Sequence, residues 1–487
     1  MKTYIGIDLG TSGVKILLVD NKGKILKEVN KEYLVVYPKS GWSEQDPKQW
    51  YNKVIEGLKE LLENQDKTAV CAISFGGQMH GLVALDKNNE VIRNAILWND
   101  GRCQKQVDYL NNTIGKEKLV KLTGNFAFAG FTAPKIMWLK ENEKDNFDKI
   151  NMILLPKDYL AFKFSNVYSS DYSDASGTLL LDVKNKCWSR KMCEIVGISM
   201  DKLPKLYESY ETVGLIKKEL AEKLNISSNV KIVAGAGDNA AAAIGTGCVF
   251  NNSCNISLGT SGTVFASSNN YMANNKVAIH SFNHATGKYH LMGCILSAAS
   301  CNKWWVEDIL KSSHSVEQKN IEKYIGENNV FFLPYLMGER CPHNDTNIRG
   351  AFLGLSANTK REEMTLAVLE GVAYALKDCL EIIKECGIDI KESTLCGGGA
   401  KSKIWAQIIA NVLNIKINFV ETEQGPGYGA AILAMVGAKE YNNVEEAVSS
   451  IVKVTNSIYP NENISKKYAK KYEAYKEIYP NIKNIQF

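Results

Sequence analysis

A five-residue sequence that occurs twice constrains this chain more than any other feature. Leu-Gly-Thr-Ser-Gly stands at residues 9–13 and again at residues 258–262, about half the chain length apart. Each copy lies between two apolar runs, a pattern that predicts two strands joined by a tight turn. A chain of 487 residues is also too long for one hydrophobic core. We therefore predict a duplicated protein, with domains at 1–247 and 248–487 and a cleft between them.

Composition excludes several classes of protein. Apolar residues make up 45% and charged residues 23%, as in an ordinary soluble globular protein. The net charge of +5 is small and the charges are interspersed, so no nucleic-acid partner is expected. No apolar stretch approaches ~18 residues and no signal peptide is evident, so no membrane association is expected. The twelve cysteines are scattered, which favours a cytoplasmic protein with reduced thiols and argues against a zinc site.

The first copy of the repeat follows an acidic residue. Asp8 stands between Ile7 and Leu9 in an apolar strand, where a lone acid is costly to bury. It either caps the turn or faces a metal–phosphate group. The turn itself, residues 10–13, offers backbone N–H groups and hydroxyls to an anion, as phosphate-binding turns do. The repetition of the turn strengthens the phosphate interpretation.

Polar residues follow several predicted strands in the first half. A helix over 47–64 with Asp46 as N-cap precedes a strand over 69–75, which ends at the sequence 76–81 with His80. Strand ends are where α/β enzymes place ligand contacts, although a structural role for this histidine is equally open. A strand over 95–98 leads to Asn-Asp-Gly-Arg, a combination that suits a sugar site or a charged hairpin turn. Residues 171–178 are predicted as a polar loop before a strand over 179–183.

Asp238 marks the sharpest single site. The apolar strand at 232–234 runs through small residues into Asp238 and Asn239, and a helix of alanine and glycine follows. Such a helix permits close backbone approach. The carboxylate either caps this helix or acts as a general base, the role expected of an aspartate in phosphoryl transfer to an alcohol.

The second half repeats these features without the acids. Ser257 stands where the first copy has Asp8, and Tyr428 stands where the first small-residue helix has Asp238. A capping box at Thr359 is predicted to start a long helix that ends at Gly387. Gly397–Ala400 lies between a strand over 393–396 and a helix over 402–413, where backbone can approach an anionic ligand. The asymmetry places the chemistry on the N-terminal domain and much of the nucleotide contact on the C-terminal domain. A tyrosine-rich tail helix over 464–479 is expected to pack on that second domain.

These residues resemble the FGGY family of carbohydrate kinases over the full chain. The matching stretches are 7–11 and 257–262 as the two phosphate motifs, 397–400 as the adenosine motif, and the two small-residue helices as the connecting motifs. The resemblance implies an α/β fold of two duplicated ribonuclease H-like domains, of the actin/Hsp70/hexokinase type, with an interdomain cleft. It further implies ATP and Mg²⁺ as cofactors. A homodimer is an expectation from the family alone.

The resemblance also assigns site residues. Asp238 is implied as the base, and Asp8 as a residue near Mg²⁺ together with Asp238. The residues implied to touch the sugar are Met79, His80, Trp98, Asp238 and Asn239. The residues expected to contact the nucleotide are Thr11, Ser12, Lys15, Gly259, Thr260, Gly398 and Gly399.

Within the family, the resemblance is to the xylulokinases. It is carried by the stretches 77–81, 97–102 and 172–178 and by the charged loop 338–343. In glycerol kinases an Arg-Glu pair stands where Met79 and His80 stand here, which argues against glycerol. Cys341 replaces a usual threonine, and Gly427 with Tyr428 replaces a usual Ala-Leu.

The predicted activity is ATP-dependent phosphorylation of D-xylulose to D-xylulose 5-phosphate, with Asp238 as general base. Two alternatives remain open: a sister kinase for another ketose or a polyol, and a non-catalytic or chaperone-like ATPase of the same fold. The chaperone-like ATPase would be marked by an appended peptide-binding domain or by a lost base.

Overall fold

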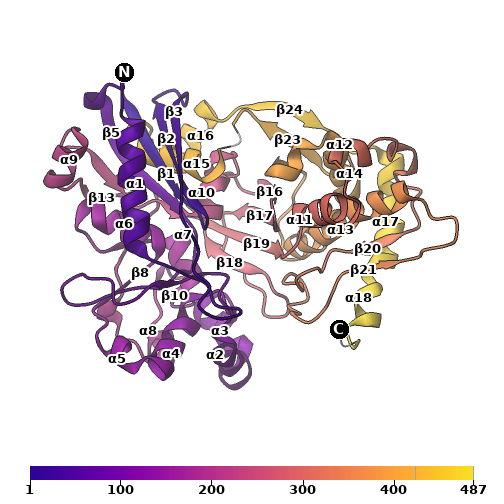
Figure 1. Cartoon of the computed structure of the whole chain (residues 1–487), viewed down its shortest axis with the longest axis horizontal. Helices are drawn as coiled ribbons and strands as arrows, with labels where there is room; N and C mark the ends of the chain where they lie inside the picture. Colours follow the sequence, from indigo (N-terminus) through magenta and orange to yellow (C-terminus); the bar gives the residue numbers. More distant parts are fainter. Residues whose placement is uncertain (423, 486–487) are drawn as a thin grey trace.

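The computed structural model describes residues 1–422 and 424–485 and shows two α/β halves side by side (Figure 1). Each half contains one seven-stranded sheet. The first sheet has the order β13-β14-β5-β1-β2-β3, with β15 paired to β5. Its strands are β1 Thr3–Leu9, β2 Gly13–Asp20, β3 Ile25–Glu32, β5 Val70–Gly77, β13 Thr212–Leu215, β14 Lys231–Val233 and β15 Ala236–Gly237.

The second sheet has the order β18-β19-β17-β16-β22-β23-β24. Its strands are β16 Cys254–Leu258, β17 Gly262–Ser268, β18 His280–Asn283, β19 Tyr289–Ile295, β22 Glu392–Cys396, β23 Lys416–Val420 and β24 Val454–Ile458. In the first sheet β3, β2 and β1 are antiparallel, whereas β1, β5 and β14 are parallel. The second sheet repeats this arrangement with β19, β17 and β16 and with β16, β22 and β23. The predicted duplicated ribonuclease H-like fold is confirmed, and both Gly-Thr-Ser turns join the first two strands of their sheet.

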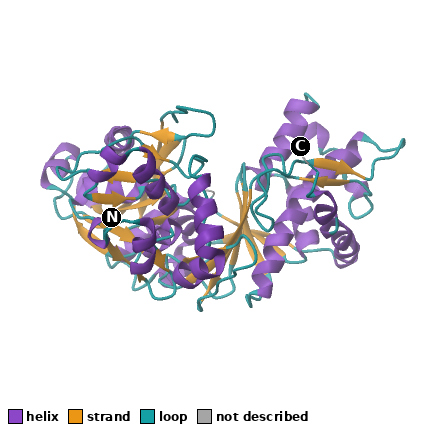
Figure 2. Cartoon of the chain, turned by 90° about the horizontal axis from the view of Figure 1, so that it is seen from below, coloured by secondary structure: helices purple, strands orange, loops and turns teal. Residues whose placement is uncertain are grey.

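Helices cover both sheets (Figure 2). The longer helices are α1 Pro47–Leu61, α4 Thr132–Asn142, α6 Pro156–Ser165, α13 Arg361–Glu385, α14 Lys403–Leu413, α15 Gly425–Gly437 and α17 Glu462–Lys476. The shorter helices are α2 Gln104–Asp108, α3 Lys116–Thr123, α5 Lys144–Asp148, α7 Tyr172–Ala175, α8 Arg190–Val196, α9 Lys218–Leu224, α10 Asp238–Gly245, α11 Ala299–Lys303, α12 His314–Glu317, α16 Val444–Ile451 and α18 Ile478–Ile482. The short strands outside the main sheets are β4 Glu44–Gln45, β6 Val83–Leu85, β7 Ala95–Ile96, β8 Met152–Leu154, β9 Ser169–Asp171, β10 Leu181–Asp182, β11 Cys187–Trp188, β12 Lys205–Tyr207, β20 Phe331–Leu333 and β21 Ala351–Leu353.

The predicted element boundaries agree with the structure in some places and differ in others. Helix α1 starts after its predicted cap, since the Asp46 carboxylate accepts a hydrogen bond from the N–H of Lys48. Helix α13 starts one residue later than the predicted box, because the N–H of Lys360 donates to Glu363 at 2.9 Å. The predicted loop 171–178 is helical, because Asp171 caps α7, and the strand after it is only β10. The strand predicted over 95–98 is the two-residue β7.

Helices α10 and α15 meet at the centre of the molecule. A Cβ atom on Gly429 would lie 1.8 Å from the carbonyl oxygen of Ala241, and one on Gly245 would lie 2.3 Å from that of Gly425. Helix α15 also lies on the first sheet, where a Cβ on Gly6 would be 2.0 Å from the carbonyl oxygen of Gly427. The close backbone approach that small residues permit occurs here between these two helices. It also brings a helix from the second half of the chain onto a sheet from the first half.

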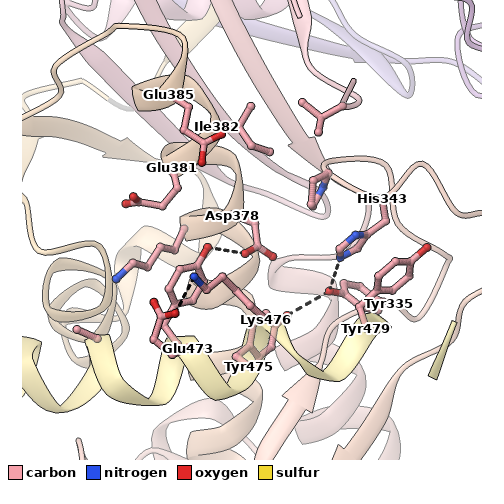
Figure 3. Close-up of a pocket in the computed structure, with 15 residues that line it drawn as sticks. Tyr335, His343, Asp378, Glu381, Ile382, Glu385, Glu473, Tyr475, Lys476 and Tyr479 are labelled. Carbon is pink, nitrogen blue, oxygen red and sulfur yellow. Dashed lines mark hydrogen bonds and ion pairs between the residues drawn. The ribbon is translucent and has the colours of Figure 1, made fainter. Parts of the chain in front are cut away.

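The tail helix packs on α13, as predicted. Tyr468 donates a hydrogen bond to Glu370 and Tyr472 donates one to Asp378, both at 2.6 Å. Figure 3 shows Asp378 within a cavity of about 420 Å³ between α13 and the tail. Tyr479 lies in α18 and stacks on His343 there. None of the predicted site residues lines this cavity. No described helix is long and apolar enough to span a bilayer.

Candidate active site

The carboxyl ends of β1, β5 and β15 meet at one edge of the first sheet, where a cleft separates the two halves. Because parallel strands place their carboxyl-end loops together, this edge is the expected position of a ligand site. A cavity of about 210 Å³ lies there. Its lining includes Met79, His80, Trp98, Asp238, Asn239 and Gly259. The structure thus brings together all five residues predicted to touch the sugar, with Gly259 and Ser261 of the second turn.

Asp238 is the first residue of α10. Gly237, not Asp238, occupies the N-cap position, and the Asp238 carboxylate accepts hydrogen bonds from the Asn239 N–H (2.7 Å) and side-chain amide (2.8 Å). Burial raises the pKa of Asp238 to about 6, and the two Asn239 bonds limit the rise. The group is therefore mostly ionised at neutral pH and close to the range in which a general base works best.

Asp8 ends the apolar part of β1 beside Asp238. Burial and, after it, the Asp238 carboxylate raise the pKa of Asp8 to about 7, and Lys15 on the neighbouring strand opposes the rise. Two carboxylates that repel each other in one cleft suit a cation between them. Mg²⁺ is usually held by one or two carboxylates together with substrate phosphates. The Asp8 and Asp238 pair fits that chemistry.

His80 is held in an uncommon conformation. Its φ is +69°, and its carbonyl accepts hydrogen bonds from Lys135 Nζ (2.9 Å) and Thr132 Oγ1 (3.1 Å). Its Nδ1 lies 2.8 Å from the carbonyl oxygen of Gly177, which can only accept. Burial lowers the pKa of His80 to about 3, so the ring is neutral. The proton is therefore on Nδ1, and Nε2 keeps a free lone pair that can accept a hydroxyl hydrogen.

Two glycines make room for the side chains of this strand-end loop. A Cβ on Gly177 would lie 2.3 Å from the His80 ring, and one on Gly237 would lie about 3.0 Å from the Met79 sulfur. Lys135 is fully buried and also donates to the carbonyl of Gly130 at 2.6 Å, so it ties two cavity walls together. Sequence reasoning missed Lys135, because residues 104–170 show no periodicity that places them.

Trp98 connects the cavity to the first turn. Its Nε1–H donates to Thr11 Oγ1 at 3.0 Å, and that hydroxyl donates to Gln78 Oε1 at 3.2 Å. The wall that would face a sugar is therefore bonded to the turn that would face a phosphate.

In both Gly-Thr-Ser turns, protein groups donate hydrogen bonds to the backbone carbonyls. In the first turn, the carbonyls of Gly10, Thr11 and Ser12 accept hydrogen bonds from Tyr33 Oη, Gln45 Nε2 and Tyr33 N. In the second, the carbonyls of Gly259 and Thr260 accept from Ala299 N and Ala298 N, each at 2.8 Å. Within the described part of the chain, the N–H groups of residues 11–12 and 259–261 donate to no protein acceptor. Both turns can therefore offer N–H groups to an anion.

A second cavity of about 860 Å³ extends from the second turn into the second half. Gly259, Thr260, Gly398 and Gly399 line it together. Gly397 has a φ of +93°, and a Cβ there would lie 2.7 Å from the carbonyl oxygen of Leu258, so the glycine triplet sits directly on the second turn. The two cavities share Gly259.

Three predicted nucleotide residues lie apart from this second cavity, on the first half. Thr11 and Ser12 form the first turn, and Lys15 on β2 donates to Gln424 Oε1 at 2.7 Å. Lys15 therefore bridges the first sheet and the start of α15. The predicted nucleotide contacts fall on two sides of the cleft.

A buried ion network lies behind Asp238. Lys157 is within 2.8 Å of Asp171 and 2.6 Å of Asp158, and Asp171 accepts a hydrogen bond from the Ser173 hydroxyl. The N–H of Gly237 donates to that hydroxyl at 3.2 Å. The predicted polar cluster at 171–178 thus supports the backbone before Asp238 rather than lining the cavity.

Sequence reasoning missed ten of the residues that line this cavity, from both halves of the chain. The cavity residues that it did not place there are Phe128, Gly130, Phe131, Ser257, Ser261, Thr263, His280, Met292, Cys294 and Arg340. Arg340 carried a signal, since the loop 338–343 stood out as charged. His280 carried none. The two unusual residues lie elsewhere: Cys341 is buried with its N–H donating to the Cys294 carbonyl, and Tyr428 donates to the Gly23 carbonyl at 2.7 Å.

Comparison with known proteins gives consistent results along the whole chain. The N-terminal domain of the FGGY family of carbohydrate kinases matches residues 3–245, and the C-terminal domain of that family matches residues 254–438. The xylulose kinase of Bacillus subtilis is 38% identical over 491 residues, covering 100% of this chain and 98% of its own.

Two solved structures superpose closely. A crystal structure named "xyloylose kinase", from Brucella ovis, has a TM-score of 0.95 and 37% identity, covering 99% of this chain and 100% of its own. A gluconate kinase from Lactobacillus acidophilus has a TM-score of 0.94 and 27% identity, covering 100% and 99%.

Proposed function

Because this chain belongs to the FGGY family of carbohydrate kinases, we propose that it transfers the γ-phosphoryl group of ATP to D-xylulose, giving D-xylulose 5-phosphate. One observation carries the proposal: the cavity that holds Asp238 and neutral His80 meets the large second cavity at Gly259. An alcohol and a nucleotide placed in the two cavities would meet at the turns. The names of the relatives support xylulose as the alcohol.

In the proposed reaction Asp238 accepts the proton of the sugar's terminal hydroxyl as its oxygen attacks the γ-phosphorus. A bond forms from phosphorus to the sugar oxygen, and the bond from phosphorus to the bridging oxygen breaks, so ADP leaves with the electron pair. The N–H groups of the two turns hold the phosphates, and most of the catalysis is positioning and electrostatic stabilisation. Mg²⁺ held by Asp8 and Asp238 would neutralise phosphate charge.

Other parts of the proposal concern the sugar, the surroundings and the assembly. His80 Nε2 and the Asn239 amide hydrogen-bond the sugar, and Met79 and Trp98 frame it. Closure of the cleft excludes water, which would otherwise compete as acceptor. We place the reaction in the cytoplasm, because ATP is the donor and no disulfide joins cysteines in the described part of the chain. A homodimer stays a prediction from the family.

The test of the mechanism is Asp238→Asn, which keeps the shape of the residue and removes the base. We expect kcat with xylulose and ATP to fall by about 10³-fold or more, with the KM for ATP nearly unchanged. A variant that keeps near-normal kcat would refute the assignment of Asp238. The matched control is Asp201→Asn, an exposed aspartate outside the cleft, for which kcat should not change.

A second candidate is a sister kinase, and the close superposition on a gluconate kinase favours testing it. Wild-type kcat/KM should be compared for xylulose, ribulose, fuculose, gluconate and xylitol. Xylulose should give the highest value; a higher value for another member would assign that substrate instead. ATP hydrolysis that is independent of sugar and yields no phosphosugar would favour the non-catalytic ATPase.

A further inference from the structure

The wall of the small cavity opposite Asp238 comes from the second half of the chain. His280 is the first residue of β18, and Arg340 lies in the loop between β20 and β21. Both line the cavity that contains His80 and Asp238. Neither contributes to the base, the metal pair or the two phosphate turns described above.

His280 is a buried polar group without a partner at one of its nitrogens. Its side chain is 1% exposed, and its Nδ1 has no hydrogen-bond partner in the described structure. The ring lies among three phenylalanines, with centroid distances of 5.1 Å to Phe128, 5.5 Å to Phe131 and 5.2 Å to Phe282. A buried polar group that lacks a partner destabilises the folded state, so a fourth phenylalanine would suit the fold better.

The surroundings keep the His280 ring neutral. Burial first, and then the charge of Arg340, lower its pKa well below the usual value. A neutral imidazole presents one donor and one acceptor, the combination that a sugar hydroxyl can satisfy.

Arg340 is a cation without an acidic partner. Its guanidinium lies 5.8 Å from the ring centre of Phe128, across the cleft, and no described carboxylate forms an ion pair with it. The Glu339 carboxylate, which precedes it, accepts hydrogen bonds from the N–H groups of Arg340 (2.7 Å) and Leu296 (3.1 Å). The loop is therefore fixed through its backbone, and the guanidinium stays available to the cavity.

A ketose carries hydroxyl groups along its whole length, and groups on the first half can reach only one side of it. We propose that His280 and Arg340 bind the hydroxyl groups of the sugar that are not phosphorylated. The second half of the chain thereby takes part in sugar selection as well as in nucleotide binding. This inference rests on the proposed carbohydrate kinase activity.

The first test is His280→Phe, which keeps an aromatic ring among Phe128, Phe131 and Phe282 and removes only the nitrogens. The KM for xylulose should rise at least about 5-fold, while the KM for ATP stays unchanged and the melting temperature does not fall. The matched control is His290→Phe. His290 is equally buried, stacks on Phe265 and has an unpartnered Nδ1, but it does not line this cavity. Its KM for xylulose should not change.

The second test is Arg340→Met, with Arg349→Met as control. Arg349 is an exposed arginine of the same loop that donates to the carbonyls of Thr346 and Ile348. Arg340→Met should raise the KM for xylulose at least about 10-fold, and titration calorimetry without ATP should show weaker sugar binding. The control should leave both unchanged.

Three results would overturn the inference. One is an unchanged KM for xylulose in both His280→Phe and Arg340→Met. Another is a fall in kcat of Arg340→Met with no change in the KM for xylulose, which would place the guanidinium on the phosphoryl group. The third is a rise in the KM for xylulose of His290→Phe that equals the rise in His280→Phe. A wild-type protein that phosphorylates no sugar would instead refute the proposed function, and this is seen before any variant is made.

Discussion

Single ionisable residues in the cleft have pKa values that differ from those in water, because burial in the cleft removes solvent. Asp8 and Asp238 become weaker acids, whereas His80 becomes a weaker base, and burial is the largest cause in each case. The histidine is therefore a fixed hydrogen-bonding group at every pH at which the protein works. The two aspartates are the groups whose ionisation changes near neutrality.

This difference predicts the pH dependence of the reaction. The pKa of Asp238 is raised from 3.8 to about 6, so below pH 6 most of the free enzyme carries a protonated Asp238 that cannot accept a proton. We expect kcat/KM for xylulose to be constant above about pH 7 and to fall as the pH drops through 6. Steady-state rates from pH 4.5 to 8.5 measure this. A profile that stays flat to pH 4.5 would contradict it.

Sequence reasoning found the cleft residues that stand at strand ends and missed those that depend on packing. Asp238 and His80 follow buried strands, so the sequence itself indicates that they reach the sheet edge. His280 reaches the cavity, and Lys135 reaches the backbone of two lining residues, because distant elements pack there. No spacing in the sequence encodes these contacts. Arg340 is intermediate: its loop stood out by charge, but its position opposite Asp238 did not.

Helices α10 and α15 show how composition controls packing at the level of elements. Their predicted close approach depended only on small residues, and the structure places backbone against backbone. The helical turn at 171–178 could not be predicted, because its polar residues serve a buried Lys157 network that only the folded chain assembles.

Gly429→Ala tests the contact between the two helices. The added Cβ would lie 1.8 Å from a backbone oxygen, so the helices must separate, and we expect a loss of about 3 kcal/mol in the free energy of unfolding or failure to fold. Chemical denaturation measures this. Gly398→Ala is the control, because a Cβ there meets nothing within 4 Å. Gly398→Ala should have the same free energy of unfolding as wild type and should raise only the KM for ATP. Equal stability of the two variants would contradict the account.

The contact between α13 and the tail predicts a pH-dependent stability. Burial raises the pKa of Asp378 and of Glu370 to about 7, so between about pH 4 and 7 the folded state binds more protons than the unfolded state. The free energy of unfolding should therefore fall as the pH rises through this range. Asp378→Asn should make that fall shallower, as measured by thermal melts at each pH. The control is exposed Asp389→Asn, whose slope should match wild type. An unchanged slope in Asp378→Asn would refute the prediction.

At the scale of the whole molecule, a helix from the second half of the chain packs on the sheet of the first half. Helix α15 of the second half covers a face of the first sheet, where Tyr4, Leu17, Val19 and Ala72 share a hydrophobic cluster with Ala431 and Ile432. The domain boundary that we propose at 247/248 falls in the loop after α10. A cut there would separate that cluster.

We therefore predict that residues 1–247, produced alone, expose these apolar side chains and aggregate. Co-expression with residues 248–487 should recover a soluble complex that contains both pieces. Size-exclusion chromatography of the two preparations measures this. A monomeric 1–247 piece with a cooperative melt of its own would contradict the prediction.

The backbone contact between α10 and α15 has a consequence for motion. Large side chains would interlock and resist rotation, whereas alanine and glycine surfaces can slide over each other with little change in buried area. The two helices meet at the centre, between the two sheets, so a small rotation there would change the distance between the two phosphate turns. Asp238 is the first residue of α10, so the base would travel with the pivot itself. The angle between the halves would then set the distance from Asp238 to the phosphate. Closure of the cleft would thus bring the base into position to accept the proton.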